Sequence, residues 1–225
     1  MKSHLSRYSV YASLLSLWTL LSSGSIHAQS LEVTIRDADG MAVENAVIEL
    51  LLDASERASY MQTSNRSVDQ LNKEFVPTVT VVTAGSDVSF PNSDDILHHV
   101  YSFSSPKMFN IPLYGKGENN DYQENFPTAG VVEIGCNIHD WMLAYIYVAE
   151  SQLAELSDSS GVARLESTPA GDYQIRVWHP RASADDMTYG VSLVAGQTAT
   201  LEISLELQRD RRIRRAPGSS GRRYK

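Results

Sequence analysis

Residue types that bind soft metal ions occur together in one short stretch of the sequence. Cys136, His139 and Met142 follow one another as C-x2-H-x2-M, and the adjacent pair His98 and His99 lies upstream. Thiolate and thioether sulfur favour Cu(I), whereas imidazole suits both oxidation states of copper. One histidine of the pair would complete a trigonal His₂Cys set with a weak axial methionine, as in electron-transfer copper sites. These residues therefore predict one redox-active copper ion, cycling between Cu(I) and Cu(II).

The two adjacent histidines cannot both face one ion, because neighbouring residues in a strand point to opposite faces of a sheet. On spacing alone, the ligand is either His98 or His99. Zinc is the main rival metal, and it would use the same cysteine and histidines with Asp140 as a fourth ligand. Met142 favours copper over zinc, since a thioether adds little to the binding of zinc.

The start of the chain predicts export. Residues 1–28 begin with basic residues, continue with a short apolar run and end in small residues at Ala28, where cleavage is expected. This order is typical of a cleaved signal peptide. The apolar run is shorter than the roughly 20 residues that span a bilayer, so we expect a periplasmic protein that does not span the membrane; an uncleaved anchor is the alternative. Exported proteins usually pair their cysteines, yet Cys136 is the only cysteine. Binding to a metal would protect its sulfur.

Charge is distributed unevenly along the chain. Residues 29–207 hold nine Lys or Arg against 26 Asp or Glu, a net charge of about −17. Such a body repels phosphates, which argues against nucleic acid as a partner, and it suits a basic protein. Residues 208–225 hold eight Lys or Arg and one Asp, which predicts a basic, disordered tail. We expect a redox partner such as a basic cytochrome or a dehydrogenase.

The pattern of the chain predicts an all-β fold. No segment has a long helical period; short runs rich in Val, Ile, Thr and Tyr alternate with turn residues instead. The expected strands are 31–35, 45–52, 79–82, 87–90, 98–103, 131–135, 143–148, 162–166, 172–178, 189–194 and 198–207. We expect a loop or short helix over 53–73 and a long polar connection over 104–125. The C-x2-H-x2-M segment then lies in a tight loop between two strands.

Motifs of the common enzyme classes do not occur. The sequence has no G-x-S-x-G, no H-E-x-x-H and no glycine-rich phosphate loop, and it lacks the C-x-x-C-H signature of haem attachment. We expect no enzymatic activity. Met108, Met187 and His179 are expected to be ordinary core or surface residues.

The residues around the predicted metal site resemble those of the cupredoxins, the group of plastocyanin and amicyanin. The C-x2-H-x2-M loop is similar to the ligand loop of amicyanin, and the stretch 83–92 followed by a histidine resembles the family's G-x-x-V-x-F-x-N…H pattern. The order FPNSD, HHVYSFS, CNIHDWM and VWHP resembles methylamine-utilisation-type plastocyanin-like proteins. The resemblance implies a cupredoxin Greek-key β-barrel or sandwich over residues 56–150, with His98 as the first ligand. His99 then replaces the family's usual Asn, and Asp140 replaces a Pro.

The flanking segments resemble a different all-β domain. Residues 29–55 and 151–207 are similar to the two parts of a carboxypeptidase-regulatory-like, or transthyretin-like, β-sandwich. The hypothesis is a cupredoxin domain inserted into a loop of that sandwich, and the alternative is one enlarged barrel.

The expected function is transfer of single electrons. Copper delivery, or a non-catalytic binding module with a structural metal, are the alternatives.

Overall fold

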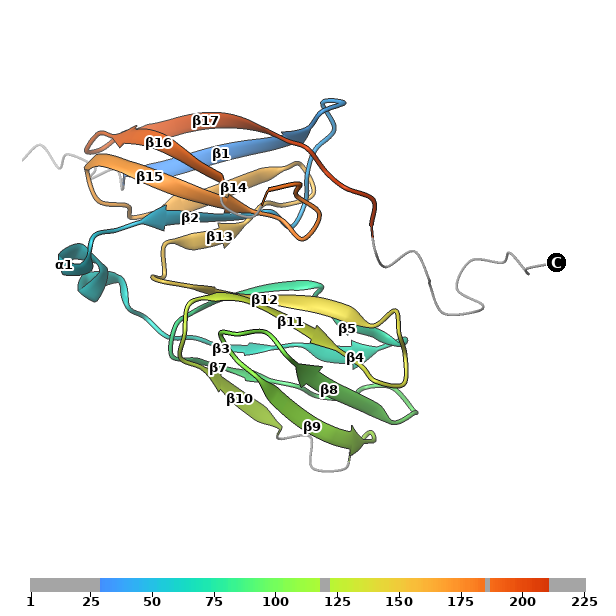
Figure 1. Ribbon diagram of the computed structural model, residues 1–225. Helices are drawn as coiled ribbons and strands as arrows, with labels where there is room; N and C mark the ends of the chain where they lie inside the picture. The colour runs from blue at the N-terminus through green and yellow to red at the C-terminus, as the bar shows by residue number, and fades with distance from the viewer. Residues whose placement is uncertain (1–28, 118–121, 185–186, 211–225) are drawn as a thin grey trace, which may run out of the picture.

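The computed structural model describes residues 29–117, 122–184 and 187–210. Their strands form two groups of sheets, drawn one above the other in Figure 1. The upper group is built from the two ends of the described chain, and the lower group from its middle. The predicted signal peptide, residues 1–28, lies outside the described residues, as does the predicted tail beyond residue 210.

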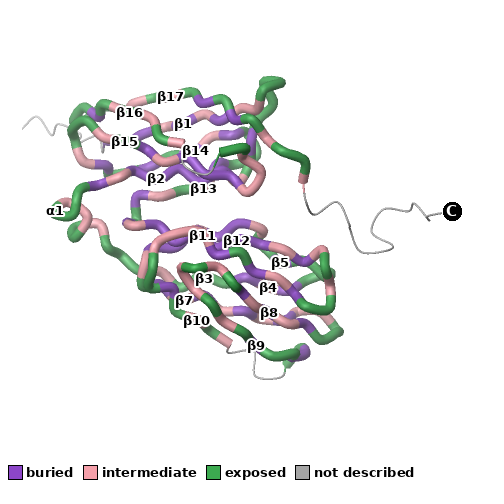
Figure 2. The backbone as a smooth tube through the Cα atoms, viewed as in Figure 1, coloured by how far each residue is buried: buried purple, intermediate pink, exposed green. Residues whose placement is uncertain are grey.

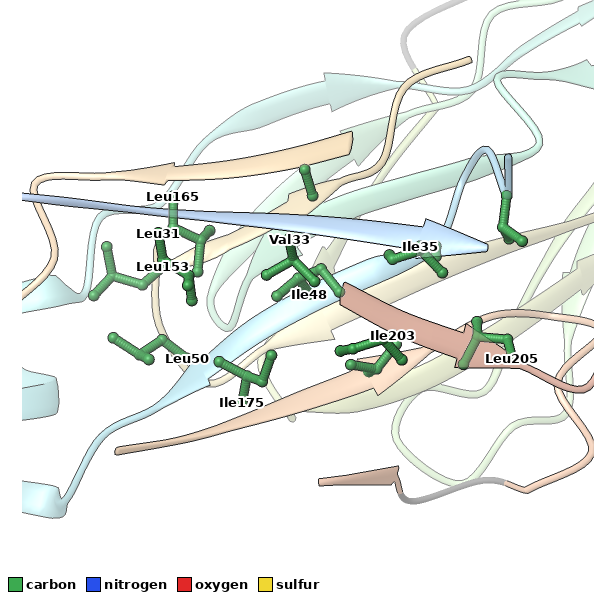
Figure 3. Packing of buried hydrophobic residues seen from close by; sticks show 14 of the residues in the cluster. Leu31, Val33, Ile35, Ile48, Leu50, Leu153, Leu165, Ile175, Ile203 and Leu205 are labelled. Carbon is green, nitrogen blue, oxygen red and sulfur yellow. The ribbon is translucent and has the colours of Figure 1, made fainter. Parts of the chain in front are cut away.

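The upper group is a sandwich of two sheets with the strand orders β14-β1-β17 and β13-β2-β15-β16. Its strands are Ser30–Asp37 (β1), Val47–Leu51 (β2), Ala154–Leu156 (β13), Val162–Glu166 (β14), Gly171–Trp178 (β15), Met187–Leu193 (β16) and Thr198–Leu205 (β17). In β1, buried Leu31, Val33 and Ile35 alternate with less buried residues. Their side chains join Ile48 and Ile175 of the opposite sheet in one core (Figure 3). β1 pairs in parallel with β17 over its whole length.

The lower group contains three open sheets, with the orders β6-β12-β11-β8-β9, β10-β7-β3 and β4-β5. Its strands are Asn65–Ser67 (β3), Asp69–Leu71 (β4), Glu74–Val76 (β5), Val79–Thr83 (β6), Ser86–Ser89 (β7), His98–Ser102 (β8), Phe109–Tyr114 (β9), Gln123–Phe126 (β10), Gly130–Gly135 (β11) and Leu143–Ala149 (β12). A second apolar core lies inside this group and includes Phe90, Phe126 and Ile146.

The two groups are packed against each other. β12 is buried along nearly its whole length (Figure 2). Alternate residues of β12 belong to the lower core and to a cluster shared with the upper group. Tyr145 and Tyr147 of β12 pack on Trp178 of β15, with ring centroids 5.6 and 5.7 Å apart. Val47 of β2 belongs to the same cluster. A strand covered on both faces explains the continuous apolar run of β12.

The prediction of an all-β fold built from β-sandwiches is confirmed, and no closed barrel forms in the described part of the chain. Among the described residues, helical structure is confined to Ala54–Arg57 (α1) and the 3-10 turn Ala58–Tyr60 (η1), inside the segment predicted as a loop or short helix. None of the described helices is long and apolar enough to cross a membrane. The names and boundaries proposed above for the two domains stay predictions.

Two connections predicted to be irregular contain strands instead. The segment 53–73 includes β3 and β4, and the segment 104–125 includes β9. Pro112 lies within β9, and a proline argues against a central strand. β9 is the edge strand of its sheet, where a proline is tolerated because one side has no neighbour to bond.

Candidate metal centre

Three of the predicted ligands converge on one point. The Nδ1 atoms of His98 and His139 are 3.2 Å apart, and the Sγ atom of Cys136 lies 4.0 Å from the first and 3.6 Å from the second. Ligand atoms bound at about 2.0–2.3 Å from one ion, in a trigonal arrangement, would be separated by about 3.5 Å. The triangle of donors therefore has the size that a single metal ion requires. It is the one cluster of its kind among the described residues.

The strands bring these donors together from separate parts of the chain. His98 is the first residue of β8, and Cys136 directly follows the last residue of β11. Gly135 pairs with Tyr101 of β8, which sets the end of β11 beside the strand that carries His98. β11 and β12 form an antiparallel pair, so residues 136–142 form the connection between them. The predicted ligand loop is therefore a tight connection between neighbouring strands.

Backbone hydrogen bonds hold this loop closed on itself. The Met142 N–H donates to the carbonyl of His139 at 2.9 Å, and the Cys136 N–H donates to the carbonyl of Met142 at 3.3 Å. The Met142 side chain is buried in the same apolar core as Cys136. The structure thus brings the donor atoms of His98, Cys136 and His139 together and places Met142 in the same apolar core as Cys136. Its role as the axial ligand stays a prediction.

The adjacent histidines separate as the alternation of a strand requires. His98 is completely buried and contributes to the cluster, whereas the His99 ring stacks on Tyr101 with centroids 5.4 Å apart. Asp140, the fourth ligand in the zinc alternative, is exposed and outside the cluster. The donor set is one thiolate and two imidazoles. This set fits copper and zinc alike; the soft sulfur favours Cu(I), and the two imidazoles suit copper in both of its oxidation states.

The surroundings of the donors favour the protonation states that bind metal at Cys136 and His139. Burial raises the pKa of the Cys136 thiol, but hydrogen bonds from His98 and from the backbone N–H groups of His99 and Ile138 outweigh it, so the pKa is lowered overall. Burial and the nearby charge of His98 lower the pKa of His139. A thiolate and a neutral imidazole are the forms that act as ligands.

His98 differs from the other two donors. Burial lowers its pKa, while hydrogen bonds with Cys136 and Asp94 raise it more, so the pKa is raised overall. A metal ion must therefore compete with a proton at this ring when it binds. The second partner, Asp94, was not among the predicted site residues. Its only signal in the sequence is an acidic residue four positions before the ligand histidine.

Comparison with protein-family models and with curated proteins finds no match. Solved structures similar to part of this chain include a Cu-containing nitrite reductase from Thermus scotoductus SA-01, with 26% identity and a TM-score of 0.35 over 39% of this chain. The match spans 23% of the reductase chain. A purple cupredoxin from Nitrosopumilus maritimus is 21% identical, with a TM-score of 0.33, over 37% of this chain and 98% of its own.

A reduced Cu(I) form of an amicyanin variant is 18% identical, with a TM-score of 0.34, over 45% of this chain and 97% of its own. With TM-scores below 0.5, the similarity is partial. What defines the metal centre is the convergence of His98, Cys136 and His139 in this chain.

Proposed function

We propose that this protein is a periplasmic copper protein that carries single electrons between redox partners and is not itself an enzyme. One copper ion would be held by His98, Cys136 and His139, with Met142 as a weak axial ligand. The observation that carries the proposal is the triangle formed by two Nδ1 atoms and one Sγ atom, with sides of 3.2, 3.6 and 4.0 Å. When bound, copper supplies a reversible one-electron couple.

The residues around the donors suit electron transfer because they hold the ligands in place. His98 is completely buried and Cys136 is 4% exposed, so neither side chain has room to move when the charge of the ion changes. His98 begins β8 and Cys136 follows β11, which pairs with β8, and the loop from Cys136 to Met142 is closed by its own hydrogen bonds. Ligands that move little keep the reorganisation small between the two oxidation states.

The site also has a route to the surface. His139 is only partly buried. Leu97, which precedes His98, and Ile138, which precedes His139, are each 48% exposed. The acidic body of the chain favours a basic partner, such as a cytochrome or a dehydrogenase, whose approach its charge would steer. Partial exposure of one ligand, with the other two enclosed, is what a carrier needs to pass electrons while it keeps its ion.

The test uses the exported chain, prepared without metal and then loaded with Cu(II). We expect one copper ion per chain, a thiolate-to-copper absorption band in the visible and reversible one-electron voltammetry. Cys136→Ser should abolish the band. Met142→Leu should keep copper but shift the reduction potential, whereas Met108→Leu, at a methionine that is 70% exposed, should change neither.

Two outcomes would contradict the proposal. A copper-loaded protein without the absorption band would argue against a thiolate ligand. Rapid loss of copper to a chelator or to an acceptor protein, without reversible voltammetry, would favour copper delivery instead.

A further inference from the structure

The buried ligand histidine is held by a carboxylate on the side away from the metal. His98 Nε2 lies 2.7 Å from the Oδ2 atom of Asp94. A carboxylate accepts hydrogen bonds, so Nε2 carries a ring proton, and Nδ1 is the ring atom turned toward Cys136 and His139. Outer partners of this kind fix the tautomer and the orientation of a ligand histidine.

Asp94 is itself fixed by a two-residue turn between β4 and β5. The N–H of Asn72 donates to Oδ1 of Asp94 at 2.6 Å, and the N–H of Lys73 donates to Oδ2 at 2.8 Å. Both turn residues have positive φ, 55° and 59°, a left-handed conformation that is unfavourable for most non-glycine residues. The strained turn thus points two N–H groups at one carboxylate, and these contacts offset its cost.

The same turn also contacts the loop of the second histidine. The Trp141 Nε1–H donates to the carbonyl of Lys73 at 3.0 Å. The Trp141 ring packs on the His139 ring with centroids 5.3 Å apart. The Lys73 residue is therefore linked to one ligand through Asp94 and to the other through Trp141.

We propose that Asp94 is a positioning residue that fixes the Nε2–H tautomer of His98 and sets a negative charge one imidazole ring away from the metal. The charge stabilises Cu(II) relative to Cu(I) and so lowers the reduction potential. This redox part rests on the proposed function, whereas the tautomer part does not.

The variant that tests the proposal is Asp94→Asn, which has the same shape. Both oxygens of Asp94 accept hydrogen bonds, Oδ1 from Asn72 and Oδ2 from Lys73 and His98, so an amide group must turn its NH₂ toward at least one N–H donor. Asp95→Asn is the matched control, because the neighbouring carboxylate is 92% exposed and pairs with the exposed Lys116. Asp94→Glu keeps the charge but moves it.

The first measurement is ¹⁵N NMR of the histidine rings in the metal-free protein. We expect a proton held on Nε2 of His98 in the wild type and in Asp95→Asn, and its loss or its exchange between the two ring nitrogens in Asp94→Asn. A wild-type His98 tautomer in a folded Asp94→Asn protein would overturn the positioning role. This readout needs no copper, so it holds even if the proposed function fails.

The second measurement is the reduction potential of the copper-loaded proteins. We expect Asp94→Asn to weaken the binding of Cu(II) relative to that of Cu(I) at least tenfold, which raises the reduction potential by about 59 mV for one electron. We expect a smaller rise in the potential for Asp94→Glu and no rise for Asp95→Asn. Equal potentials for Asp94→Asn and Asp95→Asn would overturn the electrostatic role. Should Asp94→Asn not fold, Asp94→Glu decides the outcome: an unchanged tautomer and potential in that variant would contradict the proposal.

Discussion

Tyr147 of β12 donates a 2.6 Å hydrogen bond to the carboxylate of Glu49 in β2, and this contact joins the two groups of sheets. Glu49 is 1% exposed, yet both of its oxygens have partners. Arg176 donates to Oε2 at 2.9 Å, and the backbone N–H of Glu150 donates to Oε1 at 2.6 Å. Burial, together with the charge of Glu49, raises the pKa of Tyr147. A buried carboxylate with every partner in place couples residues that are far apart in the chain.

Removal of this carboxylate should destabilise the whole molecule. We expect Glu49→Ala to lower the free energy of unfolding by about 3–5 kcal/mol, because it leaves the Arg176 charge and the Tyr147 hydroxyl without their main partner. Tyr147→Phe should cost about 1–2 kcal/mol. Urea unfolding measures both. The control is Glu32→Gln, which breaks an exposed pair with Arg164 and should cost less than about 1 kcal/mol. Equal losses for Glu49→Ala and the control would show that the buried network does not link the groups.

The two ligand histidines should respond differently to replacement by an external ligand. We expect added imidazole to restore the visible band of copper-loaded His139→Gly, since this ring is partly exposed. The same treatment should fail for His98→Gly. The His98 side chain is completely buried, so added imidazole would have to pass through the protein core to take its place. Titration of each variant with imidazole, followed by absorption, checks this. Equal rescue of both variants would contradict the difference in access.

Tyr114 carries a buried hydroxyl with two partners and belongs to the same apolar core as Cys136. It donates to the carbonyl of Phe90 at 2.6 Å and accepts from the amide of Gln70, which is also buried. Tyr114→Phe leaves the Phe90 carbonyl and one N–H of the Gln70 amide without this partner, although the amide still donates to the Pro91 carbonyl at 3.0 Å, so we expect a loss of about 1–3 kcal/mol in the free energy of unfolding. Chemical denaturation at neutral pH measures the loss. A fully stable variant would show that neighbouring groups or water replace the hydroxyl.

The contribution of Tyr114 should also depend on pH. Burial raises its pKa to about 12 from 10.0, although the hydrogen bond from Gln70 acts in the opposite direction. A raised pKa means that the phenol stabilises the fold fully below about pH 10 and loses this effect as the pH rises toward 12. The difference in unfolding free energy between wild type and Tyr114→Phe should therefore shrink over that range, by on the order of 2–3 kcal/mol. A difference that stays constant would contradict the raised pKa.

Two glycines with the same backbone conformation allow a matched test of close packing. Gly161 has φ of 80° and Gly40 has φ of 79°, so alanine is strained equally at both. A Cβ atom at Gly161 would clash with the carbonyl oxygen of Ile35 and lie 3.1 Å from the N atom of Val43, whereas one at Gly40 would meet nothing. We expect Gly40→Ala to cost about 1 kcal/mol and Gly161→Ala about 2 kcal/mol more. Thermal unfolding of the two variants decides this, and similar melting temperatures would be the contrary result.

The ligand loop and the regular strands could be predicted because their information is local. Cys136 and His139 are three residues apart, and alternation in β1 is visible in the sequence itself. The separation of His98 from His99 also follows from strand geometry. These features need no knowledge of which segments meet in space.

The parts that were missed depend on distant contacts. Asp94 becomes significant only because the turn at Asn72 and Lys73, about twenty residues upstream, reaches it through backbone N–H groups. β9 carries Pro112, which hides a strand unless its edge position is known. The partners of Glu49 come from β12 and β15, roughly a hundred residues downstream. No pattern within one segment reveals such partners.

The parallel pairing of β1 with β17 ties the beginning of the described chain to its end. During synthesis every strand of the metal centre has been made once residue 149 is complete, whereas the first strand still lacks its neighbour. The upper sandwich must therefore wait for the final strand, with the backbone edge of β1 left open in the meantime. The order of translation thus lets His98, Cys136 and His139 come together before the upper sandwich is closed.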